Sequence, residues 1–239
     1  MHNITVILNG YKRPHVLKNQ LEAINNQTIK PKEIMLWQNN DLGFDPNITK
    51  KLTTAVCNSN LGVWARFAYA LNAKTEYICI FDDDTIPGPK WLENCYNTIQ
   101  THNGLLGTIG VKFMTKTSYQ PIQRYGWANP NEDVVEVDIV GHAWFFRREW
   151  LSTFWSELPD IDQSPIVGED IHFSYTLKKY LGLSTYVPPH PANDKSMWGS
   201  MPELAWKIGQ DSAAISMNHS NLDVMSQTYV NYIKKGFKS

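Results

Sequence analysis

Hydrophobic and polar positions along the first half of the chain fall into blocks that predict alternating strands and helices. Three short apolar runs, at 4–8 (ITVIL), 33–37 (EIMLW) and 77–81 (YICIF), predict buried strands. Apolar residues recur at helical spacing after Pro14, and again over 63–73. Strands that alternate with helices form parallel sheets, so this half predicts an α/β fold with a mostly parallel sheet.

The second half has a weaker pattern. It predicts helices over 92–99, 169–181 and 222–233, and strands over 108–113, 134–140, 143–146 and 185–187. A further short strand is expected to end at Cys57, in the first half. The stretch 190–201 is rich in Pro, Gly and Ser and predicts a loop. Since neither a repeat nor a linker separates the halves, we expect one domain over 1–239.

Composition narrows the class of protein. The 239 residues are 42% hydrophobic and 19% charged, as in a globular protein. Lys and Arg number 22 and Asp and Glu 23, which argues against a protein that holds nucleic acid by bulk charge. Cys57, Cys79 and Cys95 form no CxxC pair, which argues against a disulfide scaffold or a zinc ribbon. Neither a membrane-length apolar run nor a signal peptide is recognisable, so we expect a cytoplasmic protein.

An acidic cluster is the most informative segment. Asp82, Asp83 and Asp84 directly follow the buried run 77–81. In extended chain Asp82 and Asp84 point the same way, and ligands of parallel α/β sheets bind at the carboxyl ends of strands. Adjacent carboxylates repel one another, and a divalent cation that prefers oxygen ligands, Mg²⁺ or Mn²⁺, would relieve the repulsion. A solvated acidic turn is the alternative interpretation.

Other catalytic signatures are missing from the sequence. It contains no GxGxxG, Walker A loop, HExxH or GxSxG motif. Aspartyl phosphatases of the haloacid dehalogenase type also carry an Asp-x-Asp motif after a strand, typically the first. Here Ile86 stands where that motif continues with Thr or Val, and several elements precede the cluster. Such a phosphatase is therefore the less favoured alternative.

Five segments, taken in order, carry a resemblance to a known family. They are 9–14 (NGYKRP), 36–40 (LWQNN), 60–66 (NLGVWAR), the aspartates 82–84 and 168–171 (GEDI). This set resembles the GT-A glycosyltransferases of the exostosin type and of family two, and is similar to the glycosyltransferases of large chlorella viruses. The resemblance implies a GT-A fold with a nucleotide-sugar-binding half over 1–113 and an acceptor-side half over 114–239.

The resemblance also implies metal-dependent transfer of a sugar from a nucleotide diphosphosugar to a hydroxyl of a glycan or glycoprotein. We expect the donor to be a UDP-sugar. Asp84 matches the family's metal ligand, while Asp82 and Asp83 match positions that contact the ribose or support the metal. His190 follows the last predicted strand, where some GT-A enzymes place a further metal-ligating histidine. Mn²⁺ or Mg²⁺ would offset the charge that grows on the diphosphate as the glycosidic bond breaks.

Further residues match the family's nucleotide-binding positions. Asn9, Tyr11 and Arg13 lie at its base-binding edge. Asn39 and Asn40 stand where related enzymes place an acidic residue against the base. An amide offers both a donor and an acceptor, which suits the edge of uracil, although a turn after a strand would also explain two asparagines.

On the phosphate and sugar side, Arg66 matches an arginine that reaches the diphosphate, for which a guanidinium is well shaped. Gly141 and His142 match a turn that lines the sugar pocket. Trp127 and Trp198 lie in predicted loops and could stack on sugar faces.

Glu169 and Asp170 open a predicted helix, where acidic side chains already favour the helix dipole. The resemblance places one of them near the anomeric carbon or the acceptor hydroxyl. It would act as a general base in an inverting enzyme, or as a stabilising group or nucleophile in a retaining one. Exostosin-type relatives retain and many family-two relatives invert, so the stereochemistry stays open. We expect Asp170 to carry the chemistry, with Glu169 as the alternative.

Two questions of function stay open at this point. A non-catalytic module of the same fold would bind a nucleotide sugar or a glycan without turnover. A viral relative would modify a glycan on a capsid protein, an expectation that rests on analogy.

Overall fold

The structure, a computed structural model, describes residues 3–40, 43–159, 165–209 and 219–239. The described strands are β1 (Ile4–Gly10), β2 (Glu33–Asn39), β3 (Thr53–Cys57), β4 (Tyr77–Phe81), β5 (Gly104–Phe113), β6 (Ile122–Tyr125), β7 (Val135–Val137), β8 (Ile139–Arg147) and β9 (Ser184–Val187). The helices are α1 (Leu17–Asn25), α2 (Pro46–Thr49), α3 (Ala65–Tyr69), α4 (Trp91–Thr101), α5 (Trp150–Phe154), α6 (Glu169–Leu181), α7 (Pro202–Gly209) and α8 (His219–Lys234). Short 3₁₀ turns span Pro14–Val16, Ala70–Asn72 and Lys195–Met197.

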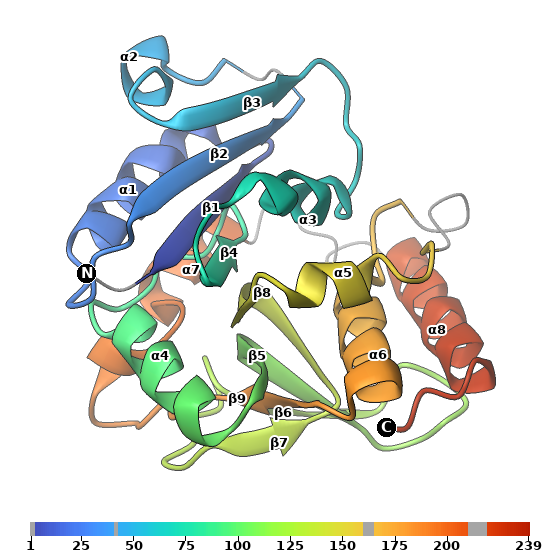
Figure 1. The fold of residues 1–239 in the computed structure, drawn as a ribbon. Helices are drawn as coiled ribbons and strands as arrows, with labels where there is room; N and C mark the ends of the chain where they lie inside the picture. Colours follow the sequence, from blue (N-terminus) through green and yellow to red (C-terminus); the bar gives the residue numbers. More distant parts are fainter. Residues whose placement is uncertain (1–2, 41–42, 160–164, 210–218) are drawn as a thin grey trace.

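These strands form one mixed sheet of nine strands (Figure 1). Its order is β3-β2-β1-β4-β8-β5-β9-β7, and β6 pairs with β5. The first four strands in this order are parallel, and the first antiparallel pair is β4 with β8. The predicted α/β fold is confirmed, and the carboxyl ends of β1, β2, β3 and β4 share one edge of the sheet.

Several predicted elements correspond closely to the observed ones. Strand β4 and helix α6 begin and end at the predicted residues. The helix predicted over 63–73 is instead α3 followed by a 3₁₀ turn. Four elements were not predicted, namely α2, α5, β6 and α7. The first three have four or five residues each, too few for a hydrophobic period to stand out.

An aromatic cluster joins α3, α5 and α6 to the sheet. Phe67 of α3 stacks on Phe154 of α5 with ring centroids 4.8 Å apart. Phe154 in turn lies edge-on to Phe173 of α6 at 5.0 Å. All three rings are fully buried, and Phe67 also packs on Trp144 of β8. This packing brings α3 and the first turn of α6 to the carboxyl end of β4.

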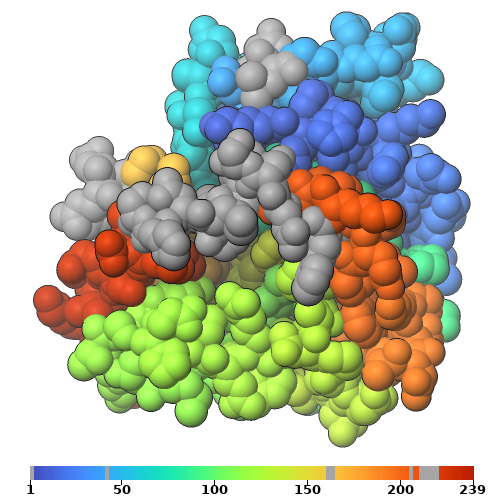
Figure 2. Space-filling view, turned by 180° about the vertical axis from the view of Figure 1, so that it is seen from behind, coloured from blue at the N-terminus to red at the C-terminus, as the bar shows by residue number. Residues whose placement is uncertain are grey.

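A second hydrophobic cluster packs on β5 and β8. Its buried members come from β5, β8, α6, α8, the loop before β6 and the segment after α8, and are Val111, Tyr119, Ile139, Ile171, Tyr175, Tyr229, Tyr232 and Phe237. Figure 1 shows α8 next to α6, and Figure 2 shows α8 from the opposite side, beside the green segment that follows β5. Across the described ranges, no helix combines the length and the apolar character that crossing a lipid bilayer requires.

Candidate active site

A tight turn carries the three aspartates at the end of β4. The backbone N–H of Asp82 donates to the carbonyl of His142 in β8 at 3.0 Å. The Thr85 hydroxyl donates to the same carbonyl, also at 3.0 Å. From α1, the buried amide of Gln20 donates to the carbonyls of Asp82 at 2.7 Å and Thr85 at 3.0 Å. The backbone of the turn is therefore fixed from both sides by α1 and β8.

Two buried arginines balance the charge of the aspartates. Arg13 contacts Asp83 through Nη1, which also lies 3.5 Å from Oδ2 of Asp84. Arg66 of α3 contacts Asp82. Burial raises the pKa of Asp83 to about 6, although Arg13 opposes the shift. Arg13, which we predicted at the base-binding edge, thus pairs with the aspartate turn.

His142 joins two of the aspartates in a group that could hold a metal ion. Asp82, Asp84 and His142 each offer one ligand atom, and these atoms lie within 4.8 Å of one another. Nδ1 of His142 is 3.7 Å from Oδ1 of Asp84. Two carboxylate oxygens suit Mg²⁺ and Mn²⁺, and the imidazole nitrogen makes the set less suited to Mg²⁺, which demands hard oxygen ligands. The donor set fits a divalent cation.

A β-bulge directs His142 toward the aspartates. The register between β5 and β8 shifts between Gly107 and Ile109, so that His142 and Ala143 together face a single residue of β5. His142 has a φ of 64°, which few residues other than glycine adopt. Bulges of this kind re-aim a side chain next to functional sites. Burial of the ring lowers the pKa of His142, but the neighbouring aspartates together have the larger effect, so its pKa is raised above the usual value.

The acid pair Glu169 and Asp170 forms the first turn of α6. Glu169 is buried, and its Oε1 lies 2.5 Å from Nη2 of Arg66. Burial raises the pKa of Glu169, while Arg66 acts in the opposite direction. Asp170 is half-buried, its Oδ1 accepts from the N–H of Ile171 at 2.7 Å, and burial raises its pKa to about 6. Asp170 is therefore the more accessible carboxylate of the pair.

Asn39, at the end of β2, organises a turn of the backbone. Its amide nitrogen donates to Oδ1 of Asn60 at 2.8 Å and to the carbonyl of Gly62 at 3.1 Å, and its oxygen accepts from the N–H of Leu61 at 2.8 Å. Asn60 in turn donates to the hydroxyl of Tyr11 at 3.1 Å. We predicted that Asn39 faces a nucleotide base. Instead, both of its amide hydrogens are donated to the turn over 60–62.

This turn over 60–62 contacts the segment that leads to the acid pair. The N–H of Val63 donates to the carbonyl of Pro165 at 3.0 Å. Gly62 has a φ of 73°, and a Cβ there would lie only 1.8 Å from the same carbonyl oxygen, so that glycine is required. Asn9, in β1, and Asn40, directly after β2, lie at this edge of the sheet.

His190 and Trp198 lie elsewhere, within the protein interior. Nδ1 of His190 is 2.8 Å from the carbonyl of Pro188 and Nε2 is 3.0 Å from the hydroxyl of Thr108. Since both ring nitrogens have protein partners and the ring is fully buried, His190 supports the fold and does not join Asp82 and Asp84. Trp198 is only 4% exposed and donates its indole N–H to the carbonyl of Pro191, so it presents no free face for a sugar.

The other residues expected on the sugar side lie together. The ring of Trp127 stacks on that of His142, with centroids 6.0 Å apart and planes 22° from parallel. Trp127 also has a positive φ, of 44°. A Cβ at Gly141 would meet no atom within 4 Å, so open space borders the same stretch of β8.

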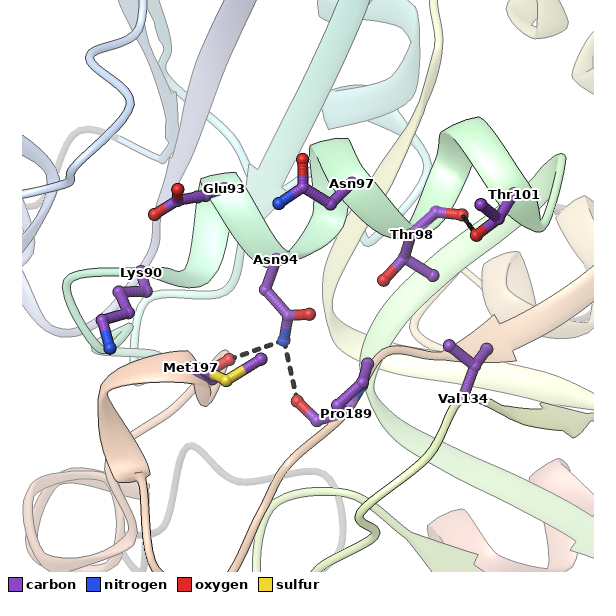
Figure 3. A pocket seen from close by; sticks show the side chains of 9 residues that line it. All are labelled: Lys90, Glu93, Asn94, Asn97, Thr98, Thr101, Val134, Pro189 and Met197. Atoms are coloured by element: carbon purple, nitrogen blue, oxygen red, sulfur yellow. Dashed lines mark hydrogen bonds between the residues drawn. The ribbon is translucent and has the colours of Figure 1, made fainter.

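A separate surface cavity, whose lining does not include the aspartates, lies beside α4 (Figure 3). Its volume is about 490 Å³, and its lining is Lys90, Glu93, Asn94, Asn97, Thr98, Thr101, Val134, Pro189 and Met197. The amide of Asn94 points into this region, but it donates to the carbonyls of Pro189 at 2.7 Å and Met197 at 3.0 Å. The cavity contains none of the predicted site residues.

Sequence reasoning missed two residues at the aspartate turn. Gln20 occupies the buried stripe of α1 between Leu17 and Ile24, and a polar residue on an apolar stripe was the available signal. Gly209 ends α7 so near Asp84 that a Cβ would lie 2.9 Å from the carboxylate. No sequence signal indicates that approach, because it depends on the tertiary path of α7.

Comparison with known proteins gives one family match. Residues 5–155 match the family model described as Glycosyl transferase family 2. No curated protein sequence matches the chain.

Solved structures with a similar fold include two that hold a nucleotide sugar. Staphylococcus aureus TarS 1–349 in complex with UDP-GlcNAc is 17% identical with a TM-score of 0.53, covering 82% of this chain and 60% of that one. The mannosyltransferase PcManGT from Pyrobaculum calidifontis, in complex with GDP-Man and Mn²⁺, is 19% identical with a TM-score of 0.52, covering 81% and 58%. The chain thus spans about three fifths of the length of these proteins, and at this identity the likeness shows the fold.

Proposed function

The chain belongs to glycosyl transferase family 2, and on that premise we propose that it transfers a sugar from a nucleotide diphosphosugar to an acceptor hydroxyl with the help of a divalent cation. The observation that carries the proposal is the group formed by Asp82, Asp84 and His142 close to the acid pair of α6. Arg66 contacts both Asp82 and Glu169, so the two parts of the site are separated by one guanidinium.

In the proposed site, Asp82, Asp84 and His142 would hold the cation. Bound there, Mn²⁺ would act as a Lewis acid and stabilise the charge of the departing diphosphate. One charge placed in this way is typically worth ~3 kcal/mol of activation free energy. Arg13 and Arg66 would keep the carboxylates oriented, because each guanidinium contacts them from a buried position.

Asp170 would be the general base. Glu169 is buried against the cationic Arg66, whereas Asp170 is the more exposed of the two and keeps one carboxylate oxygen beyond its bond to the N–H of Ile171. In its ionised form that oxygen would accept the proton of the acceptor hydroxyl as the hydroxyl oxygen attacks the anomeric carbon. Inversion of the anomeric centre would support this role, and retention would support the exostosin-type resemblance instead.

We propose a UDP-sugar as the donor and a glycan or glycoprotein as the acceptor. The complex of TarS with UDP-GlcNAc supports uridine, and that of PcManGT with GDP-Man and Mn²⁺ supports the cation and makes guanosine the alternative. Tyr11, Asn40 and Asn60 are the side chains at the sheet edge that we propose to face the base. The resemblance to chlorella-virus enzymes adds a capsid glycan as a candidate acceptor.

A thermal-shift and turnover experiment tests the proposal. We expect UDP to raise the melting temperature mainly when Mn²⁺ is present, and a panel including UDP-GlcNAc and GDP-Man to reveal a donor that is hydrolysed with Mn²⁺. Binding of UDP without turnover of any donor would indicate a non-catalytic module. Hydrolysis of an aryl phosphate without nucleotide binding would indicate the phosphatase.

A further inference from the structure

Helix α8 lies outside the matched segment 5–155 and contacts the residues on both sides of the acid pair. A Cβ at Gly168 would lie 2.8 Å from Cγ2 of Thr228, so the methyl group of Thr228 packs against the backbone just before Glu169. The hydroxyl oxygen of Tyr232 lies 2.7 Å from Nδ1 of His172, two residues after Asp170. The turn that carries the acid pair is thus contacted by α8 at both ends.

The His172 ring joins three helices in one defined orientation. Nε2 lies 2.7 Å from the carbonyl oxygen of Phe154 in α5. A carbonyl can only accept, so Nε2 carries the hydrogen, and Nδ1 accepts from the hydroxyl of Tyr232. The ring is buried, and this burial lowers its pKa to about 4, so it is neutral at pH 7. Both nitrogens are used, and the ring connects α8 with α6 and α5.

Helix α8 also makes contacts that do not involve α6, and these provide the comparison for the bond between Tyr232 and His172. The hydroxyl of Tyr229, one turn before Tyr232, donates to the carbonyl of Thr115 at 2.8 Å. Its ring stacks on Phe113 of β5 with centroids 3.9 Å apart. Ser226 accepts from the N–H of Tyr119 at 3.3 Å. These contacts hold the segment after β5, shown in green beside the red helix in Figure 2.

We propose that α8 is part of the catalytic apparatus, with Thr228 and Tyr232 as positioning residues that fix Asp170 through Gly168 and His172. This inference rests on the proposed function, because it assigns the role of general base to Asp170. A base acts only within hydrogen-bond reach of the hydroxyl it deprotonates, and a displacement of about 1 Å can lower a rate by ~100-fold. A helix that contacts both ends of a single turn restricts such displacement.

Two variants of the full chain separate positioning from simple stabilisation. Tyr232→Phe and Tyr229→Phe each remove one hydroxyl from α8, but only the first loses a bond to α6. With Mn²⁺ and the donor that the wild type turns over, we expect Tyr232→Phe to lower kcat about tenfold and to leave the Kd for UDP with Mn²⁺ within about twofold. Tyr229→Phe should keep kcat within about twofold of the wild type, even if it lowers the melting temperature as much as Tyr232→Phe does. Equal kcat for the two variants would overturn the inference.

Amide hydrogen exchange provides a readout that does not need turnover. We expect Tyr232→Phe to speed exchange in the first turn of α6, where the N–H of His172 donates to the carbonyl of Gly168 at 2.9 Å, about tenfold more than Tyr229→Phe does. The same exchange rate in both variants would overturn the inference even in an active enzyme. A wild type that turns over no donor would instead overturn the proposed function, while the exchange rates still decide whether α8 fixes this turn.

Discussion

Arg66 and Glu169 form a buried ion pair, with Nη2 of the arginine 2.5 Å from Oε1 of the glutamate. The two side chains are only 3% and 10% exposed, and the guanidinium also lies 4.4 Å from the centre of the Trp144 ring. The pair ties α3 to the first turn of α6. Since Arg66 contacts Asp82 as well, the acid pair and the aspartate turn share one cation.

Replacing Arg66 by methionine should therefore destabilise the protein. The change leaves Glu169 and Asp82 without their partner, and an unpaired buried charge typically costs about 3–5 kcal/mol. We expect a loss in this range from urea denaturation followed by tryptophan fluorescence. Adding Glu169→Gln should recover part of it, because the carboxylate left unpaired is then neutral. A loss below about 1 kcal/mol would show that the pair is not buried as described.

Asn39→Asp should disturb the turn over 60–62. A carboxylate cannot donate to Oδ1 of Asn60 or to the carbonyl of Gly62, and it would repel both. We expect a loss of about 2 kcal/mol in stability and weaker binding of UDP by calorimetry. For stability alone, Asn40→Asp is the matched control, since aspartate tolerates the positive φ of that residue, and it should cost less than about 0.5 kcal/mol. An equal loss of stability in the two variants would argue against the role given to Asn39.

The rate of transfer should rise with pH in the acid range. Burial raises the pKa of Asp170 to about 6, and a general base must be ionised to accept a proton. The ionised fraction grows as pH passes from 5 to 7, so kcat should grow over that range and then level off. We expect Asp170→Asn to lower kcat by at least ~100-fold and to abolish this pH dependence. A wild-type rate independent of pH over that range would exclude Asp170 as the base.

Two buried histidines should each lower the stability of the fold in acid. Burial lowers the pKa of His172 and of His190 to about 4. An unfolded histidine binds its proton near pH 6.5, so the unfolded chain binds more protons between these values. The stability that each histidine contributes is fully present above pH 6.5 and should fall as the pH drops toward 4, by up to ~3 kcal/mol for each ring. Because the raised pKa values of Asp83, Glu169 and Asp170 act in the opposite direction, the histidine contribution is measured as the difference between wild type and His190→Asn in urea midpoints at pH 7, 5.5 and 4.5, and this difference should change in favour of His190→Asn as the pH falls.

The parts of the molecule that sequence predicts well are those fixed by local pattern. The run 77–81 has five consecutive buried positions and ends at the aspartates, and α6 follows a glycine with a φ of 106° that sets its first residue. In both cases one short segment carries the hydrophobic pattern together with acidic residues at its end or its start. The fold class and the position of the acidic turn follow from such segments.

The parts that sequence predicts poorly depend on how distant segments meet. His142 joins Asp84 because a bulge in β8 turns its side chain, and the bulge depends on the register with β5. His190 and Trp198 lie in a polar stretch that reads as a loop, yet both are buried against each other, with ring centroids 6.1 Å apart. Periodicity cannot show which loop residues a fold will cover.

Calorimetric titration of UDP, with and without Mn²⁺, into the wild type and Asp84→Asn tests the central claim most directly. Asp133→Asn, a change to an exposed carboxylate outside the cluster, is the control. We predict that Mn²⁺ tightens UDP binding to the wild type and to the control by at least about tenfold, or ~1.4 kcal/mol, and leaves binding to Asp84→Asn unchanged. Equal enhancement by Mn²⁺ in Asp84→Asn and the wild type would contradict a cation held by Asp82, Asp84 and His142.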